Sequence, residues 1–168
     1  MSEVHKFYIK GHEVLIDKDK IELVLKYKWH ISKSGENSFY VATNIPIGNK
    51  QKKLFLHRLI LNSSSETNTL LVDHINRNSL DNRLCNLRLC TFSENARNSS
   101  SRKNSSSKYL GVSIRSKKYK KRIYAAQIKD FKKIIKLGYF ANEIEAAKAY
   151  NEAAIKYHGE FANLNKFE

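Results

Sequence analysis

The feature that most constrains this chain is a stretch of ten residues, 98–107, that contains no aliphatic or aromatic side chain. Such a segment has nothing to bury in a hydrophobic core, and its Ser and Asn residues are typical of a linker. The chain as a whole is 41% hydrophobic and 11% aromatic, so the regions on either side have material for cores of their own. The sequence therefore predicts two small domains, residues 1–98 and 108–168, joined by a linker at 99–107.

The chain is strongly basic, which restricts the partners that it can bind. Its 31 Lys and Arg residues outnumber its 16 Asp and Glu residues, giving a net charge of +15. Residues 108–136 alone contain eleven basic residues and one acid, Asp130. A surface of this kind favours a polyanion, with nucleic acid as the first choice and an anionic membrane surface as the alternative.

Two other features of the sequence bear on where the protein acts. No apolar run is long enough for a membrane-spanning helix. The first residues lack the basic and then apolar pattern of a secretion signal. We therefore expect an intracellular, cytoplasmic protein.

The C-terminal region has the pattern of three strands followed by one helix. Short β-prone runs at 111–115, 123–129 and 134–139 are separated by polar turns, as in antiparallel hairpins. Asn142 can then cap a helix whose alanines recur on one face, and Gly159 can end it. We expect a three-stranded antiparallel sheet packed on one helix.

If one face of that sheet packs on the helix, strand alternation leaves the other face open. The residues left on the open face would be Ser113, Arg115, Ala125, Gln127, Lys129, Ile134 and Lys136. Arg and Lys can pair with guanine and phosphates, and Gln can pair with adenine, so such a face could bind the major groove of DNA. The alternative is a charged face that serves only solubility.

Several motifs of this region resemble those of a known DNA-binding domain. They are the segments 109–112 (YLGV), 124–130 (YAAQIKD), 137–140 (LGYF), 145–154 (EAAKAYNEAA) and 163–165 (NLN). In this order and spacing they resemble the Apetala-two/ethylene-response-factor domain. The resemblance implies that the sheet contacts DNA through Arg115, Gln127, Lys129, Lys136 and Tyr139.

This chain also departs from the plant domains. They carry arginine where it has Leu110, Ser113 and Ile134, and tryptophan where it has Lys136. Plant target sequences therefore do not transfer to it.

A second constellation lies in the N-terminal region, where Asp73 and His74 end an apolar run. A polar loop, a strand-like segment at 86–90 and a helix beginning near 91–94 follow. If the strands pair and the helix packs across them, Asp73 and Asn95 can converge on one cation. Their oxygen donors favour Mg²⁺ or Mn²⁺ over zinc. His74 could take a proton from a water molecule, which suits hydrolysis of a phosphodiester.

The alternative interpretation of this constellation is structural. The acids and amides of the loop would then only form turns, and His74 would be an ordinary half-buried ring. The motifs across this region decide between the two. They are 57–60 (HRLI), 73–74 (DH), 81–83 (DNR), 86–88 (NLR) and 94–95 (EN).

Over about residues 54–98 these motifs resemble an HNH endonuclease of the ββα-metal class, in the branch that includes phage and intron-encoded homing endonucleases. The resemblance implies that Asp73 and Asn95 are metal ligands and that His74 is the general base. It also implies that Asn86 orients His74 by a hydrogen bond.

His57 matches a recurrent position of the same family. We assign it to structure or phosphate contact, outside the catalytic set. Residues 1–53 suggest strands and a short helix, and we assign them no chemistry. The expected fold class is α+β, with an N-terminal ββα-metal nuclease domain and a C-terminal three-stranded antiparallel sheet packed on one helix.

These observations predict a metal-dependent endonuclease that hydrolyses phosphodiester bonds in duplex DNA, with the role of a homing endonuclease of a phage or other mobile element. The first alternative is a DNA-binding regulator whose nuclease motif is inactive. The second, an RNA-binding protein, lacks the aromatic stacking signature of single-strand modules. With one catalytic motif per chain and no heptad pattern, a monomer is favoured. A monomer would be expected to nick its substrate, and a double-strand break would need either a dimer or two successive events. The resemblance implies a bacterium or a virus-infected cell as the host.

Overall fold

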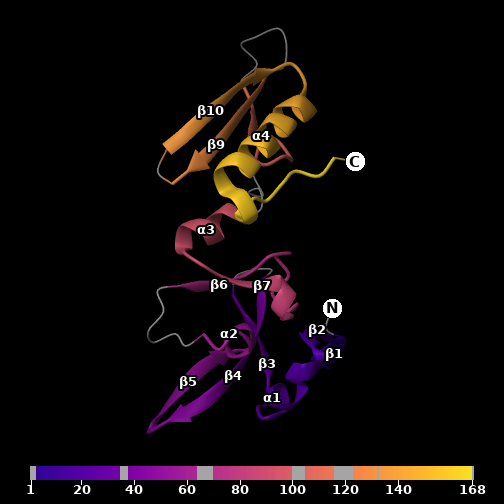
Figure 1. Ribbon diagram of the computed structural model, residues 1–168, viewed down its shortest axis with the longest axis vertical. Helices are drawn as coiled ribbons and strands as arrows, with labels where there is room; N and C mark the ends of the chain where they lie inside the picture. Colours follow the sequence, from indigo (N-terminus) through magenta and orange to yellow (C-terminus); the bar gives the residue numbers. More distant parts are fainter. Residues whose placement is uncertain are drawn as a thin grey trace. The chain divides into compact units, whose positions relative to one another are not determined.

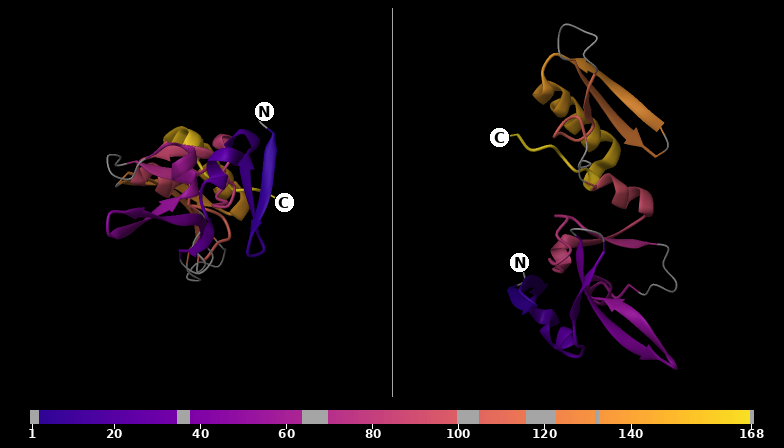
Figure 2. Two further views of the ribbon diagram at one scale, coloured as in Figure 1. Left: turned by 90° about the horizontal axis from the view of Figure 1, so that it is seen from below. Right: turned by 180° about the vertical axis from the view of Figure 1, so that it is seen from behind.

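The computed structural model of the protein describes residues 3–34, 38–63, 70–99, 105–115, 123–131 and 133–167. It divides the chain into two compact units, Met1–Thr91 and Phe92–Glu168. The architecture is mixed α and β, with several small sheets and few helices (Figures 1 and 2). Among the described residues, no helix combines the length and apolar character that crossing a membrane requires.

The first unit is built from three small antiparallel sheets and two short α-helices. The strand pairs are β1 (Val4–Ile9) with β2 (His12–Asp17), β4 (Phe39–Ile47) with both β3 (His30–Lys33) and β5 (Lys50–Phe55), and β6 (Leu71–His74) with β7 (Leu87–Cys90). The helices are α1 (Ile21–Leu25) and α2 (Leu56–Ile60). The turn between β1 and β2 has a positive φ at both Lys10 and Gly11, which suits the twist of a two-residue hairpin.

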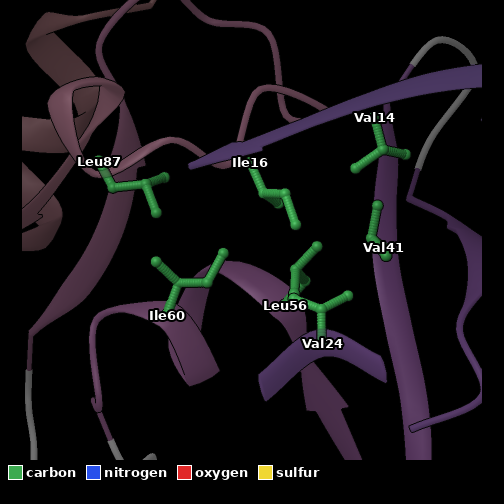
Figure 3. Close-up of a cluster of buried hydrophobic side chains, with 7 residues drawn as sticks. All are labelled: Val14, Ile16, Val24, Val41, Leu56, Ile60 and Leu87. Atoms are coloured by element: carbon green, nitrogen blue, oxygen red, sulfur yellow. The ribbon is translucent and has the colours of Figure 1, made fainter. Parts of the chain in front are cut away.

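One hydrophobic core holds these pieces of the first unit together. Its buried side chains are Val14, Ile16, Val24, Val41, Leu56, Ile60 and Leu87 (Figure 3). They come from two strands of different sheets, from both helices and from β7, so the burial of each side chain, worth about 1.5–3 kcal/mol, ties one element to the others. The core thereby fixes the positions of α2 and β7. His57 belongs to α2, and β6, the partner strand of β7, carries Asp73 and His74.

The second unit combines a short helix with a three-stranded antiparallel sheet and a long helix. The short helix is α3 (Phe92–Arg97), the strands are β8 (Val112–Ile114), β9 (Tyr124–Asp130) and β10 (Lys133–Phe140) in the order β10-β9-β8, and the long helix is α4 (Glu143–His158). The buried alanines of α4 let this helix lie close against Ala126 and Ile128 of β9. They include Ala146, Ala147 and Ala154.

The ends of α4 follow from its flanking residues. The side chain of Asn142 accepts a hydrogen bond from the Ile144 amide at 2.8 Å, which satisfies one of the unpaired donors of the first turn. Gly159 follows the last helical residue with a φ of 56°, a conformation that glycine adopts without strain.

The division of the chain differs from the sequence-based boundaries. We expected α3 in the first domain, but its contacts place it in the second unit. The guanidinium of Arg97 pairs with Asp130 at 3.0 Å and stacks over the ring of Phe131, and Asn163 donates a hydrogen bond to the carbonyl of Ser99 at 3.0 Å. The Arg97 contacts tie α3 to the end of β9, and the Asn163–Ser99 hydrogen bond links the start of the unit to its C-terminal segment.

The predicted linker also behaves differently where the structure describes it. Ser107 is buried, and its hydroxyl donates a hydrogen bond to Glu143 at 2.7 Å and accepts one from the Tyr109 amide at 3.1 Å. The C-terminal end of the predicted linker, at Ser107, is thus packed against the rest of the second unit. Residues 100–104 of the predicted linker and the Lys-rich turn at 116–122 lie outside the described residues.

Candidate active site

The pairing of β6 with β7 positions Asp73 and His74. In this pair, Asp73 lies opposite Arg88, and His74 lies opposite Leu87. Both Asp73 and His74 are only 6% exposed. Because neighbouring residues of a strand point to opposite faces, the carboxylate and the imidazole have different surroundings.

The carboxylate of Asp73 is paired with a half-buried arginine. Nη2 and Nε of Arg88 lie 2.7 Å and 2.9 Å from Oδ2 of Asp73. A buried carboxylate is strongly disfavoured without such compensation, so Arg88 supplies the opposite charge that balances Asp73 at this position. The sequence analysis assigned no role to Arg88, although it belongs to the quoted segment 86–88.

The imidazole of His74 lies in a cluster of rings. The ring centroid of His57, at the start of α2, is 5.2 Å away with its plane nearly perpendicular, and that of Tyr40, on β4, is 6.3 Å away. His57 in turn stacks on Phe55 with ring centroids 5.4 Å apart. The cluster limits how the His74 ring can turn. Nothing in the sequence signals that Tyr40 belongs to it.

A polar loop between β6 and β7 closes the other side of His74. The side chain of Asn82 is fully buried, and its Oδ1 lies 3.5 Å from Nε2 of His74. The backbone of Asn82 is fixed by β2, because its amide donates to the carbonyl of Leu15 at 2.7 Å. Asn82 lies within the quoted segment 81–83, but the sequence analysis gave it no role.

Asn86 holds the same loop together. Its side-chain oxygen accepts a hydrogen bond from the Asn76 amide at 2.9 Å, and its side-chain nitrogen donates to the Asp81 carbonyl at 2.8 Å. Its own carbonyl accepts from the amide of Ile75, the residue that follows His74, at 2.9 Å. Asn86 therefore braces the backbone next to His74, and its predicted hydrogen bond to the imidazole itself stays a prediction.

Asp81 is the charged centre of the loop. Both of its carboxylate oxygens lie 2.7 Å from the Arg83 side chain, and Asn76 donates to it at 2.8 Å. Burial acts to raise the pKa of Asp81, but pairing with Arg83 prevails and holds that pKa below its usual range. The segment 81–83 thus forms an ion pair at its ends and presents Asn82 to His74.

The two imidazoles of the cluster are kept neutral. Burial lowers the pKa of His74, and the Asn82 hydrogen bond and the nearby Asp73 carboxylate offset this only in part. Burial, with smaller effects of His74 and Arg58, lowers the pKa of His57 to about 3. A neutral imidazole can accept a proton, which is the state that a general base requires before the reaction.

Asn95, the other predicted metal ligand, is half-buried on α3. It belongs to the second unit, whereas Asp73 and His74 belong to the first. The structure brings Asp73, His74 and Asn86 together. The convergence of Asn95 on Asp73 stays a prediction.

The residues predicted to contact DNA lie together on the sheet of the second unit. Arg115, Gln127, Lys129, Lys136 and Tyr139 are all exposed. Nη1 of Arg115 donates to the Tyr139 hydroxyl at 3.3 Å, and its guanidinium lies 5.4 Å from the centre of the Tyr139 ring.

An irregularity in β10 explains how Tyr139 joins this group. Lys136 lies opposite Gln127, and Tyr139 lies opposite Ala125, with a bulge between Lys136 and Gly138. The extra residue shifts the alternation, so that two side chains three positions apart point to the same face. Gln127, Lys136 and Tyr139 therefore share the face that α4 leaves open.

Comparisons with known proteins bear on the segment that forms the cluster. Residues 55–97 match the family model of the HNH endonuclease. A protein of Acanthamoeba polyphaga mimivirus that carries the name "Uncharacterized HNH endonuclease L560" is 33% identical over 159 residues, which cover 95% of this chain and 78% of the viral protein. This chain belongs to the HNH endonuclease family. No solved structure matches the chain of this HNH endonuclease.

The family match in this HNH endonuclease extends from the end of β5 to the end of α3. It contains all the residues for which the sequence analysis predicted a nuclease role, which are His74, Asn86, Asp73 and Asn95. It ends before the sheet of the second unit, so the resemblance of that sheet to plant DNA-binding domains stays a prediction.

HNH nucleases generally use divalent metal ions. The donors of this HNH endonuclease are of the kind that a hard cation prefers, because Asp73 supplies carboxylate oxygens and Asn95 an amide oxygen. A cation held by Asp73 would share or replace its pairing with Arg88. In the described parts of the chain, no three His, Cys, Asp or Glu side chains are grouped to hold a metal ion. Mg²⁺ is commonly bound through one or two carboxylates together with waters and phosphate oxygens, so a single carboxylate and an amide are compatible with it.

Proposed function

We propose that this HNH endonuclease hydrolyses phosphodiester bonds in duplex DNA with Mg²⁺ or Mn²⁺ as its cofactor. The observation that carries the proposal is the neutral, buried imidazole of His74 next to Asp73, inside the segment that matches the family. The imidazole can accept a proton, and the carboxylate can hold a cation. Hydrolysis of a phosphodiester requires both functions.

We assign the residues as follows. His74 accepts the proton of the attacking water, and Asn86 braces the chain beside it. Asp73 and Asn95 would hold the metal ion. When bound, the ion would neutralise charge on the phosphate and stabilise the leaving oxygen.

The exposed face of the second unit would supply most of the grip on DNA. Arg115, Gln127, Lys129, Lys136 and Tyr139 combine cationic, amide and aromatic groups on one sheet, as binding in a major groove requires. We infer that this unit is a DNA-binding domain of the Apetala-two/ethylene-response-factor type.

A nuclease core joined to a separate DNA-binding unit suits a homing endonuclease of a mobile element. The viral origin of the relative is in keeping with an enzyme that acts inside an infected host cell. A monomer with one catalytic motif would nick one strand.

Incubation of the full chain with supercoiled plasmid, with Mg²⁺ or with EDTA, tests the proposal. We expect nicked circles with Mg²⁺ and unchanged plasmid with EDTA. Retained binding without any cleavage in Mg²⁺ or Mn²⁺ would favour the alternative of a DNA-binding regulator with an inactive nuclease motif. Direct formation of linear plasmid would contradict the single nick.

A further inference from the structure

The β4–β5 hairpin of the first unit is a basic arm. Figures 1 and 2 show its two strands extending together away from α2 to the turn at residues 48–49. From residue 38 to residue 63 the chain carries three lysines and one arginine and no acidic residue. The function proposed above does not use this arm.

Strand register divides the side chains of the hairpin between two faces. Phe55 lies opposite Ala42, Lys53 opposite Asn44, and Gln51 opposite Pro46. Side chains of opposite residues, and of every second residue along a strand, share a face. One face therefore carries Tyr40, Asn44, Gln51, Lys53 and Phe55, and we call it the Lys53 face.

Side-chain contacts agree with this division. The rings of Tyr40 and Phe55 are 5.9 Å apart at the base of the hairpin, and Nζ of Lys53 lies 6.0 Å from the centre of the Phe55 ring. The exposed Lys53 also donates to the hydroxyl of Ser32 at 3.2 Å, which holds it beside β3. Asn44 and Gln51 are exposed farther along the same face.

The Lys53 face continues directly into the candidate active site. Tyr40 contacts the rings of both His57 and His74, and Phe55 stacks on His57. A polymer whose cleaved bond lies at His74 would therefore have its adjoining part next to this face.

We propose that the Lys53 face binds the sugar-phosphate backbone of duplex DNA beside the bond that is cleaved. This inference rests on the proposed nuclease function. It assigns Lys53 to a phosphate and the amides of Asn44 and Gln51 to neighbouring backbone oxygens. The Lys53 face then sets where the scissile phosphate lies relative to His74.

The dimensions of the hairpin fit this partner. A strand rises about 3.3 Å per residue, so Lys53 and Gln51 lie about 7 Å and 13 Å along the arm from Phe55. One strand of DNA carries a phosphate about every 3.4 Å along the helix axis. The Lys53 face therefore spans phosphates about two to four nucleotides from the phosphate nearest Phe55.

The β1–β2 hairpin of the same unit differs from the β4–β5 hairpin in the pairing of its lysines. On β1–β2 the ammonium of Lys6 pairs with Glu13 at 3.3 Å, and Lys18, just after β2, pairs with Glu3. Acidic neighbours balance these lysines within the protein. The sequence of the β4–β5 hairpin contains no acid, and Lys53 donates to the neutral hydroxyl of Ser32, so its charge can also face a phosphate.

The full-chain variant Lys53→Gln tests the proposal, with Lys50→Gln as its matched control. Lys50 is an exposed lysine of the same strand on the opposite face of the hairpin. Binding of a labelled duplex oligonucleotide of random sequence is followed by fluorescence anisotropy in EDTA at several salt concentrations. We expect Lys53→Gln to lower the slope of log affinity against log salt by about 0.9, the loss of one phosphate contact. Lys50→Gln should leave the slope unchanged.

Lys53→Arg should retain the wild-type slope, and the fluorescence of Trp29, the single tryptophan of the chain, reports whether each variant is folded. Equal slopes for the wild type and Lys53→Gln would overturn the proposal, as would equal losses in Lys53→Gln and Lys50→Gln. Because the assay needs no cleavage, it separates this inference from the nuclease function. A wild-type protein that fails to nick plasmid, combined with a lower slope for Lys53→Gln, would contradict the proposed function and leave the phosphate contact of Lys53 in place.

Discussion

His74 owes its properties to neighbours from three different parts of the first unit. β7 pairs with its backbone, α2 contributes the ring of His57, and the loop contributes the amide of Asn82. Each neighbour is buried, so a change in any of them alters either the orientation or the hydration of the imidazole. This is why residues outside the catalytic set matter for the chemistry.

Replacement of the general base is the most direct test at the scale of a residue. We expect His74→Ala to lower the rate of plasmid nicking about 10²–10⁴-fold, because the substitution removes the general base that takes the proton of water. DNA affinity measured in EDTA should stay near the wild-type value. His5→Ala, in a half-buried histidine of the same unit, is the control and should cut normally. Wild-type nicking by His74→Ala would remove His74 from the mechanism.

His57 predicts a pH dependence of stability. Its folded-state pKa of about 3 lies below the ordinary value of 6.5, so the unfolded chain takes up a proton first as the pH falls. The stability that neutral His57 contributes is therefore complete above pH 6.5 and is lost as the pH falls toward 3, by at most about 1.4 kcal/mol per pH unit.

This loss can be measured by urea unfolding followed through Trp29. The comparison is His57→Phe, which keeps a stacking ring but cannot be protonated. Between pH 6.5 and pH 4 the wild type should lose more stability than this variant. Parallel losses in both proteins would show that other groups, such as Asp81, account for the acid sensitivity.

At the scale of the element, the second unit depends on one close approach between a turn and a helix. Gly111 precedes β8 with a φ of 70°, and a Cβ there would lie 1.9 Å from the Tyr150 ring and 2.6 Å from the carbonyl of Gln127. Neither the helix nor the strand can yield easily, because both belong to the core of this unit.

We therefore expect Gly111→Ala to destabilise the second unit by about 2–4 kcal/mol, from steric overlap added to backbone strain. Gly159→Ala is the matched control, since its φ is also positive but nothing lies within 4 Å of the added Cβ. It should cost about 1–2 kcal/mol. Thermal melts of the full chain by circular dichroism would measure both. Equal costs would mean that the contact with Tyr150 relaxes freely.

Elements whose buried side chains recur at a regular spacing could be predicted from the sequence. Elements that form only through pairing with another strand could not. The alanine-rich face of α4 and its cap at Asn142 could be identified from spacing alone. β5 could not, because Lys50–Phe55 reads as a polar run and becomes a strand through backbone pairing with β4. The order of Asp73, His74 and Asn86 indicated one site, whereas Asn82 and Arg88 join it only through folding.

At the scale of the whole molecule, the two units should fold independently. We expect the fragment 92–168 to fold alone and to melt at a higher temperature than the fragment 108–168. The shorter fragment lacks residues 92–107, and with them the Arg97–Asp130 ion pair and the Ser107–Glu143 hydrogen bond. Circular dichroism melts of both fragments would show the difference. Identical melting temperatures would mean that residues 92–107 contribute nothing to this unit.

The packing of α3 bears on how such a protein can be recombined. The helix ends the segment that matches the HNH family, yet Arg97 anchors it to the strand that carries Asp130. A chimera assembled at the Ser-rich segment would separate the helix from the surface that supports it. An engineer who exchanges the DNA-binding module should therefore keep α3, which carries Asn95, with the nuclease, and should choose a module that offers an acid at the position of Asp130.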